Sequence, residues 1–134
     1  MNNKYLLDTN ICIYIIKYQP LHVRERFRQH HFSDLYLSVI TLGELRFGSE
    51  KSQAKDKVMK TIQNLEKMMQ IAVLDEQVAS HYGDIRQQLQ QRGQMIGNND
   101  LWLAAHARAN NWIMVTNNEK EFVRVEGLRV ENWV

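Results

Sequence analysis

Short apolar runs alternate with longer amphipathic segments along most of this 134-residue chain. The runs are Tyr5–Leu7, Leu35–Val39, Ile71–Leu74 and Trp112–Val115, with a weaker fifth at 128–130. Each run is too short for a helix, and the first one ends at Asp8, where residues that commonly begin helices follow. Strand–helix alternation with such short connections predicts an α/β fold of three layers, in which helices cover both faces of a mainly parallel sheet of four to five strands.

The segments between these runs show the periodicity of helices. The spacing of apolar residues predicts helices after residue 10, after Pro20, and over 41–47, 52–69, 78–89 and 100–110. We expect Gly48 and Gly93 at helix ends and Asn98–Asn99 as the cap that begins the last of these helices. The length is that of one domain with a sizeable core, so residues 1–134 are expected to fold as a single unit.

Composition limits the class of protein. The chain has no run of 18 apolar residues, so a membrane span is not expected, and its first apolar stretch is too short for a secretory signal. A single cysteine, Cys12, rules out a disulfide framework and agrees with a cytoplasmic protein. The net charge of +2 permits a nucleic-acid partner without requiring one. The glycines match neither a dinucleotide-binding nor a nucleotide-phosphate loop.

Acidic and polar residues fall just beyond the predicted strands. Asp8 directly follows the first strand, Glu44 lies about one turn into the helix after the second, and Asp100 opens the helix of 100–110. The fourth strand is followed by Thr116–Asn118, with Glu119 and Glu121 just beyond. Because functional sites in such sheets form beyond the carboxyl ends of the strands, we expect the carboxylates of Asp8, Glu44 and Asp100 to converge at one edge.

Converging carboxylates repel one another, so a folded protein tolerates them with a compensating cation or with raised pKa values. Oxygen ligands without His or Cys partners suit Mg²⁺ or Mn²⁺, and such ions can activate water against a phosphodiester. An ordinary structural explanation exists for each residue as well: Asp8 and Asp100 as acids at helix N-termini, Glu44 on a solvated helix face, and Thr116 in a turn. The pattern alone does not separate the two explanations.

The remaining polar residues carry weaker signals. The five histidines have no metal-ligand spacing, and His106 lies among alanines, which is typical of a packed side chain. Arg24, Arg28 and His31 share one helical face that could contact phosphate or simply be solvated. The three tryptophans are candidates for the core or for an interface.

Four motifs, in this order and spacing, resemble the PIN-domain family, and more narrowly the VapC toxins of bacterial type II toxin–antitoxin modules. The motifs are Leu6–Asn10, Thr41–Leu45, Ile96–Ala107 and Val115–Asn118, and the tail Glu121–Trp133 is also VapC-like. The resemblance covers essentially the whole chain. It implies a Mg²⁺-dependent endoribonuclease, with Mn²⁺ as a possible substitute, and a PIN-domain fold.

The resemblance also assigns roles to residues. Asp8, Glu44 and Asp100 match the acidic metal-site residues, with Asp8 and Asp100 as the metal ligands. Many PIN domains carry an acid close after the last Thr or Ser, where this chain has asparagines, so Glu121 becomes the fourth acidic candidate. The polar residues matched to a supporting role are Asn10, Thr116 and Asn118.

The family further implies partners. Related toxins cleave the initiator tRNA in its anticodon loop, and others cut a different tRNA or a ribosomal RNA loop; we expect the initiator tRNA, with inhibition of translation as the result. A VapB-type antitoxin would cover the toxin and alone contact operator DNA, and the toxin would form a homodimer, which could assemble further with the antitoxin. Met59, Met68 and Met69 could form an adaptable surface for a partner, or could fill the core.

Three other classes of protein are alternatives. A non-catalytic RNA-binding or assembly module of PIN type would be expected to lack some of the acids that are intact here. A phosphatase of the haloacid-dehalogenase kind needs a second Asp where this chain has Asn10. A DNA-binding regulator would need a helix-turn-helix or a basic arm, and the sequence has neither.

Overall fold

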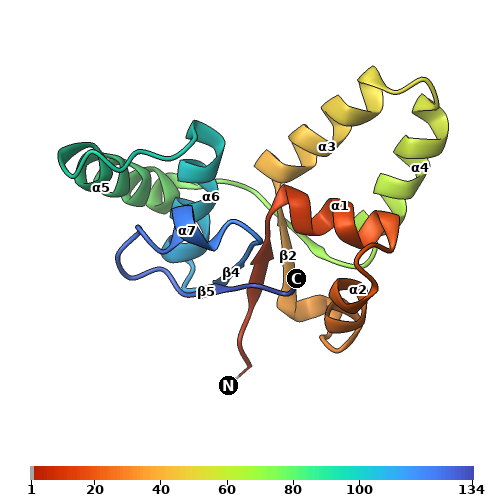
Figure 1. Ribbon diagram of the computed structural model, residues 1–134, viewed down its shortest axis with the longest axis horizontal. Coiled ribbons are helices and arrows are strands. Elements are labelled where there is room, and N and C mark those ends of the chain that lie inside the picture. The colour runs from red at the N-terminus through yellow and green to blue at the C-terminus, as the bar shows by residue number, and fades with distance from the viewer. Residues whose placement is uncertain (1) are drawn as a thin grey trace.

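The computed structural model describes residues 2–134 and contains a five-stranded sheet in the order β3-β2-β1-β4-β5 (Figure 1). All four pairings between neighbouring strands are parallel. The strands are β1 Tyr5–Leu7, β2 Leu35–Ser38, β3 Gln70–Ala72, β4 Ile113–Val115 and β5 Val130–Glu131. The predicted parallel sheet of four to five strands is therefore confirmed, with its fifth strand two residues later than expected.

Helices cover both faces of this sheet. They are α1 Thr9–Lys17, α2 Leu21–Arg28, α3 Val39–Lys51, α4 Lys55–Glu66, α5 Glu76–Gln91, α6 Asn98–Ala109 and α7 Glu119–Phe122, with a short 3-10 helix at Phe32–Asp34. Side chains alternate across a strand, and in β1 Leu7 joins the core beneath α1 to α4 while Leu6 joins the core beneath α5 to α7. Figure 1 shows the two groups of helices on opposite sides of the strands. The three-layer α/β/α prediction is confirmed.

Two predicted helix boundaries are wrong. Gly48 does not end its helix, because α3 continues to Lys51; an isolated glycine is tolerated inside a helix at a modest cost. Asn98 and Asn99 are not the cap of α6 but its first two residues, and the N-cap is Gly97, which has no side chain to donate or accept. Gly93, by contrast, follows α5 in the left-handed conformation expected of a glycine stop, with φ at 65°.

The long predicted helix over 52–69 is shorter in the structure. Its regular part is α4, which ends at Glu66, and Met69 lies beyond it in the core, 5% exposed. Among residues 2–134, no helix is both long and apolar enough to cross a membrane.

The middle of the sheet positions the site. β1 pairs with β2 on one side and β4 on the other, so its carboxyl end has a strand end on each flank. The backbone N–H of Asp8 donates to the carbonyl of Val115 at 3.0 Å, which carries the pairing of β1 and β4 one residue past the strand. The chain therefore leaves the sheet at Asp8, beside the end of β4.

Candidate active site

Asp8 is a buried carboxylate at the centre of the carboxyl edge of the sheet. Its side chain is 5% exposed and serves as the N-cap of α1, with Oδ1 accepting the backbone N–H of Ile11 at 2.9 Å. Oδ2 accepts the hydroxyl of Thr116 at 2.5 Å. Burial raises the pKa of Asp8, the charge of Glu44 adds to this, and the hydrogen bonds oppose it. Both oxygens of the Asp8 carboxylate are thus fixed by hydrogen bonds, one to Ile11 and one to Thr116.

Thr116 joins the end of β4 to the next turn. Its buried hydroxyl donates to Asp8 and accepts the backbone N–H of Asn118 at 2.9 Å. The side chain of Asn118 makes no capping hydrogen bond to α7, so its observed contribution comes from the main chain. The structure therefore gives Thr116 a direct supporting contact with Asp8.

Glu44 reaches the site from α3. Its Oε1 accepts the hydroxyl of Thr9 at 2.6 Å, and the Thr9 hydroxyl also lies 3.5 Å from that of Thr41. Thr9 was not singled out from the sequence, although it stands between Asp8 and Asn10 in the first motif. The side chain of Asn10 is exposed, and what this residue gives Asp8 is a hydrogen bond from its backbone.

Asp100 and Glu121 form the other half of the site. Asp100 lies in the first turn of α6 and Glu121 in α7, after β4. Burial raises the pKa of Asp100 to about 6, helped by the charge of Glu121, by a hydrogen bond between the two side chains, and by the charges of Asp8 and Glu44. The structure thus brings the four acids predicted from the sequence within electrostatic reach of one another.

The chemistry of these donors fits a hard divalent cation. All are carboxylate oxygens, and no Lys or Arg within residues 2–134 forms an ion pair with any of the four acids. The same residues contain no ready-made group of three acidic, His or Cys ligands around one point. An ion that keeps several waters and takes one or two protein carboxylates, as Mg²⁺ does, suits this spacing.

The sequence of this chain is similar to a known domain family and to proteins of known name. A family model described as a PIN domain matches residues 5–128. The chain belongs to the PIN-domain family. It is 44% identical to "Ribonuclease VapC2" of Haemophilus influenzae over 98% of both chains. It is 42% identical to "tRNA(fMet)-specific endonuclease VapC" of Shigella flexneri, covering 97% of this PIN domain and 98% of that protein.

Solved structures agree with this family. The PIN domain superimposes on a chain of DNA-bound VapBC from Salmonella typhimurium with a TM-score of 0.93 and 39% identity, covering 99% of this chain and 100% of the other. It also superimposes on a chain of VapBC2 from Rickettsia felis, bound to a promoter DNA fragment, with a TM-score of 0.88 and 36% identity, covering 97% and 98% of the two chains. The predicted relationship to the VapC ribonucleases is therefore confirmed.

Proposed function

We propose that this chain is the toxin of a type II toxin–antitoxin pair and that it hydrolyses RNA phosphodiester bonds with a bound Mg²⁺, for which Mn²⁺ can substitute. The observation that carries the proposal is the group of four acids at the carboxyl edge of the sheet, with raised pKa values at Asp8 and Asp100. Such a group stores repulsion that a divalent cation would relieve.

Three of the four acids have defined parts in this mechanism. Asp8 and Asp100 would hold the ion, which lowers the pKa of water and neutralises charge on the phosphate. Glu44, with one oxygen fixed by Thr9, orients the attacking water and accepts its proton on the other oxygen. Because water is the nucleophile, the RNA 2′-hydroxyl is not needed, and the products carry a 5′-phosphate and a 3′-hydroxyl. A cyclic phosphate product would contradict this mechanism.

We propose the anticodon loop of the initiator tRNA as the substrate, so that cleavage inhibits translation in the cytoplasm. The support is the 42% identity with the tRNA(fMet)-specific endonuclease of Shigella flexneri. Unpaired loop bases leave the backbone open to an edge site of this kind. Another tRNA or a ribosomal RNA loop is the alternative that fragment mapping distinguishes.

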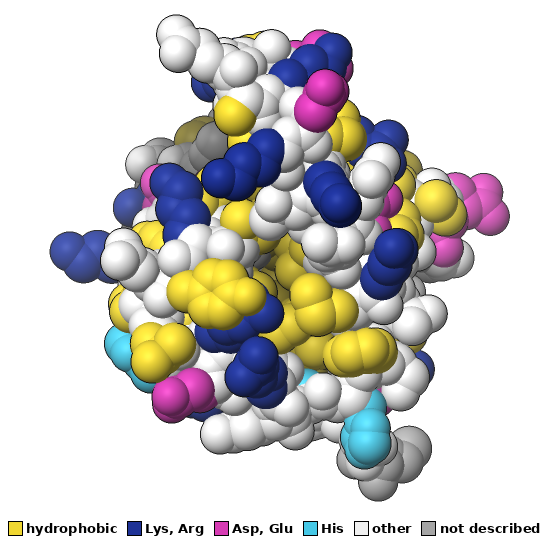
Figure 2. Space-filling view, turned by 90° about the vertical axis from the view of Figure 1, so that its right-hand side faces the viewer, with side chains coloured by type: hydrophobic (Ala, Val, Ile, Leu, Met, Phe, Trp, Pro, Cys, Tyr) yellow, Lys and Arg dark blue, Asp and Glu magenta, His cyan; other side chains and the backbone are white. Residues whose placement is uncertain are grey.

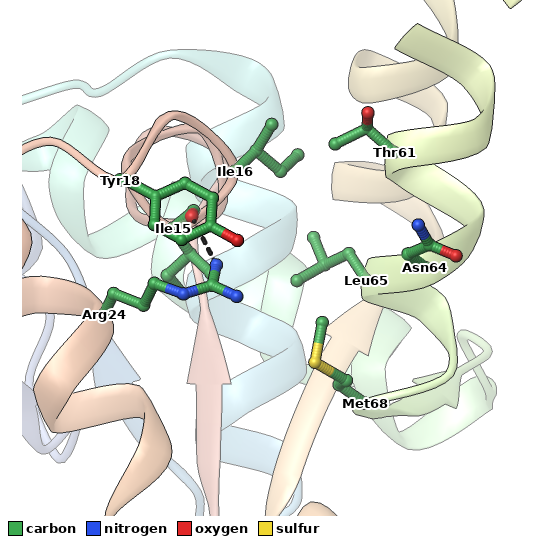
Figure 3. Close-up of a pocket in the computed structure, with 8 residues that line it drawn as sticks. All are labelled: Ile15, Ile16, Tyr18, Arg24, Thr61, Asn64, Leu65 and Met68. Atoms are coloured by element: carbon green, nitrogen blue, oxygen red, sulfur yellow. Dashed lines mark hydrogen bonds between the residues drawn. The ribbon is translucent and has the colours of Figure 1, made fainter. Parts of the chain in front are cut away.

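The antitoxin partner is proposed on the face formed by α1, α2 and α4, where apolar side chains lie among Lys and Arg (Figure 2). A cavity of 220 Å³ between these helices contains Arg24, whose guanidinium lies 3.8 Å from the ring centre of Tyr18 and donates to the carbonyl of Ile15 at 2.9 Å (Figure 3). Met68 lines this cavity, whereas Met69 is in the core, so the predicted methionine surface is only partly available.

A second, apolar groove of 330 Å³ lies next to that cavity. Ile16 lines both, and the groove runs along α1, α3 and α4 as far as Glu44. An amphipathic segment of a VapB-type antitoxin would bury its apolar face there and end beside the site carboxylates. The related VapBC structures from Salmonella typhimurium and Rickettsia felis support a toxin–antitoxin pair. We propose that the toxin itself is a homodimer and that operator DNA is contacted through the antitoxin.

The test is cleavage of total bacterial RNA by antitoxin-free protein with Mg²⁺ or Mn²⁺, with and without EDTA, followed by mapping of every new 5′ end. Asp8→Asn keeps an acceptor for the N-cap of α1 while removing the charge, and it should be inactive. Asp56→Asn, which changes an exposed acid of α4, is the matched control and should cleave like the wild type.

Metal-dependent cuts confined to one tRNA loop would support both the nuclease and its substrate. Cuts in another RNA would keep the nuclease and replace the substrate. No cleavage by the wild type, or equal cleavage by Asp8→Asn, would overturn the nuclease and leave a non-catalytic RNA-binding module to be tested.

A further inference from the structure

A buried histidine lies between the helices that carry Glu44 and Asp100. His106 is in α6, on the same helix as Asp100, and is 1% exposed. Its Nδ1 lies 3.0 Å from Oγ of Ser38, which is fully buried at the end of β2. Ser38 is also the N-cap of α3, the helix that carries Glu44. This side-chain contact therefore links the start of α3, which carries Glu44, to the middle of α6, which carries Asp100.

The hydrogen bonds around His106 determine which atom donates. The Ser38 hydroxyl oxygen accepts the backbone N–H of Ile40 at 3.1 Å, which leaves its proton free to donate to Nδ1. The backbone of Val73 favours the protonated form of the ring, and since Nδ1 accepts from Ser38, the proton of the neutral ring lies on the other nitrogen. Burial lowers the pKa of His106, against a smaller opposing effect of the Asp75 charge. The ring is thus neutral and held in one tautomer.

The buried imidazole of His106 lies at a position where an apolar side chain would be expected. The neighbouring residues of α6 are apolar and buried, among them Leu103, Ala104 and Ala107, and an apolar side chain would avoid the cost of burying an imidazole. The imidazole adds a directional contact between α6 and Ser38. A hydrogen bond fixes the separation and orientation of its partners more sharply than apolar packing does. On the other flank of α3, Thr41 lies beside Thr9 of α1 at 3.5 Å. The start of α3 is therefore fixed by polar contacts on both sides.

We propose that His106 is a positioning residue: through Ser38 it sets α3 against α6 and thereby the distance between the carboxylates of Glu44 and Asp100. The inference rests on the proposed function, because that distance matters only if the two acids work on one water and one ion. Neither His106 nor Ser38 touches the reacting atoms in this scheme, and their effect is on the placement of Glu44.

The variants separate positioning from general stability. His106→Asn keeps an acceptor near the position of Nδ1, His106→Gln places its amide near the other ring nitrogen, and Ser38→Ala removes the donor. Ser49→Ala is the matched control, because Ser49 is a fully buried serine of α3 whose hydroxyl donates to the carbonyl of Lys55 instead of to α6. Cleavage of RNA is measured at a temperature at which circular dichroism shows each variant folded, and Mn²⁺ binding is measured without RNA.

We expect Ser38→Ala and His106→Gln to lower kcat about tenfold with KM for RNA little changed, since a displaced catalytic group is costly even when the substrate surface is intact. His106→Asn should stay within about threefold of the wild type, and the double variant Ser38→Ala with His106→Gln should be no slower than either single one. Mn²⁺ should bind equally well to Ser38→Ala and Ser49→Ala, because in the proposed mechanism Asp8 and Asp100 hold the ion and Glu44 does not. A lower unfolding temperature is expected in all four single variants.

Equal kcat in the wild type, Ser38→Ala and His106→Gln would overturn the inference while leaving the proposed ribonuclease intact. So would an equal loss in His106→Asn and His106→Gln, or in Ser49→Ala and Ser38→Ala, because that would be the pattern of a structural role alone. A wild type that neither binds Mn²⁺ nor cleaves RNA would overturn the proposed function and this inference with it.

Discussion

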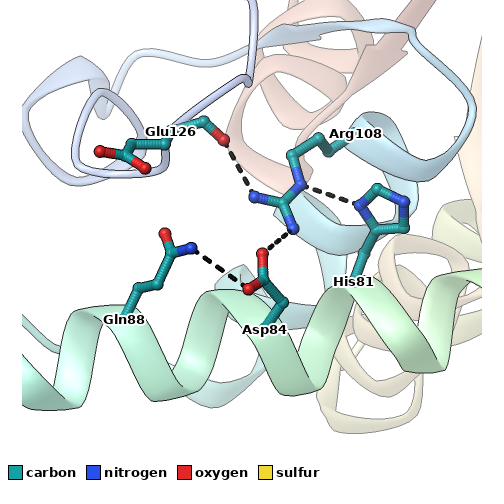
Figure 4. A network of polar contacts seen from close by, with 5 residues as sticks. All are labelled: His81, Asp84, Gln88, Arg108 and Glu126. Atoms are coloured by element: carbon teal, nitrogen blue, oxygen red, sulfur yellow. Dashed lines mark hydrogen bonds and ion pairs between the residues drawn. The ribbon is translucent and has the colours of Figure 1, made fainter.

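Two clusters of charged side chains lie on the two halves of α6. They differ in whether their carboxylates have a cationic side chain as a partner. In the second half of the helix, Arg108 donates to Asp84 at 2.6 Å, to the carbonyl of Glu126 at 3.0 Å and to Nδ1 of His81 at 2.8 Å (Figure 4). The Arg108 side chain is 13% exposed, while that of Asp84 is 51% exposed, so their ion pair lies at the edge of solvent. Here an acid is neutralised by the protein itself.

In the first half of α6, Asp100 faces other acids instead of a cation. Its pKa is raised to about 6 by burial and by the nearby charge of Glu121, and Asp8 and Glu44 contribute in the same direction. The difference is instructive because an arginine is well able to satisfy carboxylates on this helix. Within residues 2–134, Asp84 has an arginine partner and the four site acids have no Lys or Arg partner, which keeps a place for a cation from outside.

Exchange of one acid for its amide in each cluster should have opposite consequences. Asp100→Asn is expected to lower the cleavage rate at least about 100-fold, because an ion held by carboxylates contributes several kcal/mol to the transition state. The same variant should unfold at a higher temperature without metal, since it removes repulsion with Glu121. Cleavage assays and thermal unfolding measure the two effects.

Asp84→Asn is the matched exchange. It weakens the contact with Arg108 and should lower the unfolding temperature while the folded protein still cleaves RNA. Loss of cleavage in Asp84→Asn together with full cleavage in Asp100→Asn would reverse the interpretation of the two clusters.

Mg²⁺ should stabilise the acidic cluster and leave the Arg108 cluster unaffected. At an ion concentration about 30 times its Kd, binding to the folded state alone adds about 2 kcal/mol to the free energy of unfolding. Urea unfolding with and without Mg²⁺ measures the gain. Arg108→Met should keep the whole gain and Asp8→Asn should lose most of it; an equal gain in both variants would place the ion elsewhere.

Removal of Arg108 should affect stability more than activity. Arg108→Met loses three hydrogen bonds, one of them to a carboxylate, and is expected to cost about 1–2 kcal/mol of unfolding free energy. Arg86→Met is the control, because Arg86 is exposed and donates to the hydroxyl of Tyr82 at 2.9 Å. A similar loss of unfolding free energy in both variants would show that the Arg108 contacts stabilise the fold no more than those of an exposed arginine.

The smallest effect expected is the pH dependence of the metal-free protein. The pKa of Asp100 in the folded state, about 6, lies above its ordinary value of 3.8, so the folded protein binds a proton more readily than the unfolded chain. The contribution of Asp100 therefore raises stability as pH falls from about 7 to about 5, and Asp100→Asn should remove that part. Added Mg²⁺ should weaken the trend, because the ion competes with the proton.

Local pattern predicted the α/β fold and the gathering of Asp8, Glu44 and Asp100 at one edge, whereas Glu121 was added by the resemblance to the VapC toxins. Strand ends followed by Asp8, Thr116 and the turn before Glu121 can be recognised from neighbouring residues alone, and parallel strands must end at one edge of the sheet. The start of α6 was misjudged by the same method: Asn98 and Asn99 look like a cap, but they are the first two residues of the helix, and Gly97 is its N-cap.

The partners inside the site could not be obtained in this way. Thr9, not Asn10, turns its side chain to Glu44, and the two residues differ only by their angle around α1. His106 looked like a packed side chain among alanines, and it is packed, but its partner Ser38 is 68 residues away in the chain. Contacts over such separations depend on how the layers are stacked.

The order of strands and helices along the chain, the edge at which the acids gather, and the family all follow from the sequence. The charge balance of the site follows from the tertiary structure. Asp100 acquires its raised pKa from Glu121, which reaches it because α7 follows β4 and packs beside β5. Repulsion between carboxylates depends on distance and burial, and these are properties of the packed layers, whereas the spacing of residues in a strand or helix is a property of the chain.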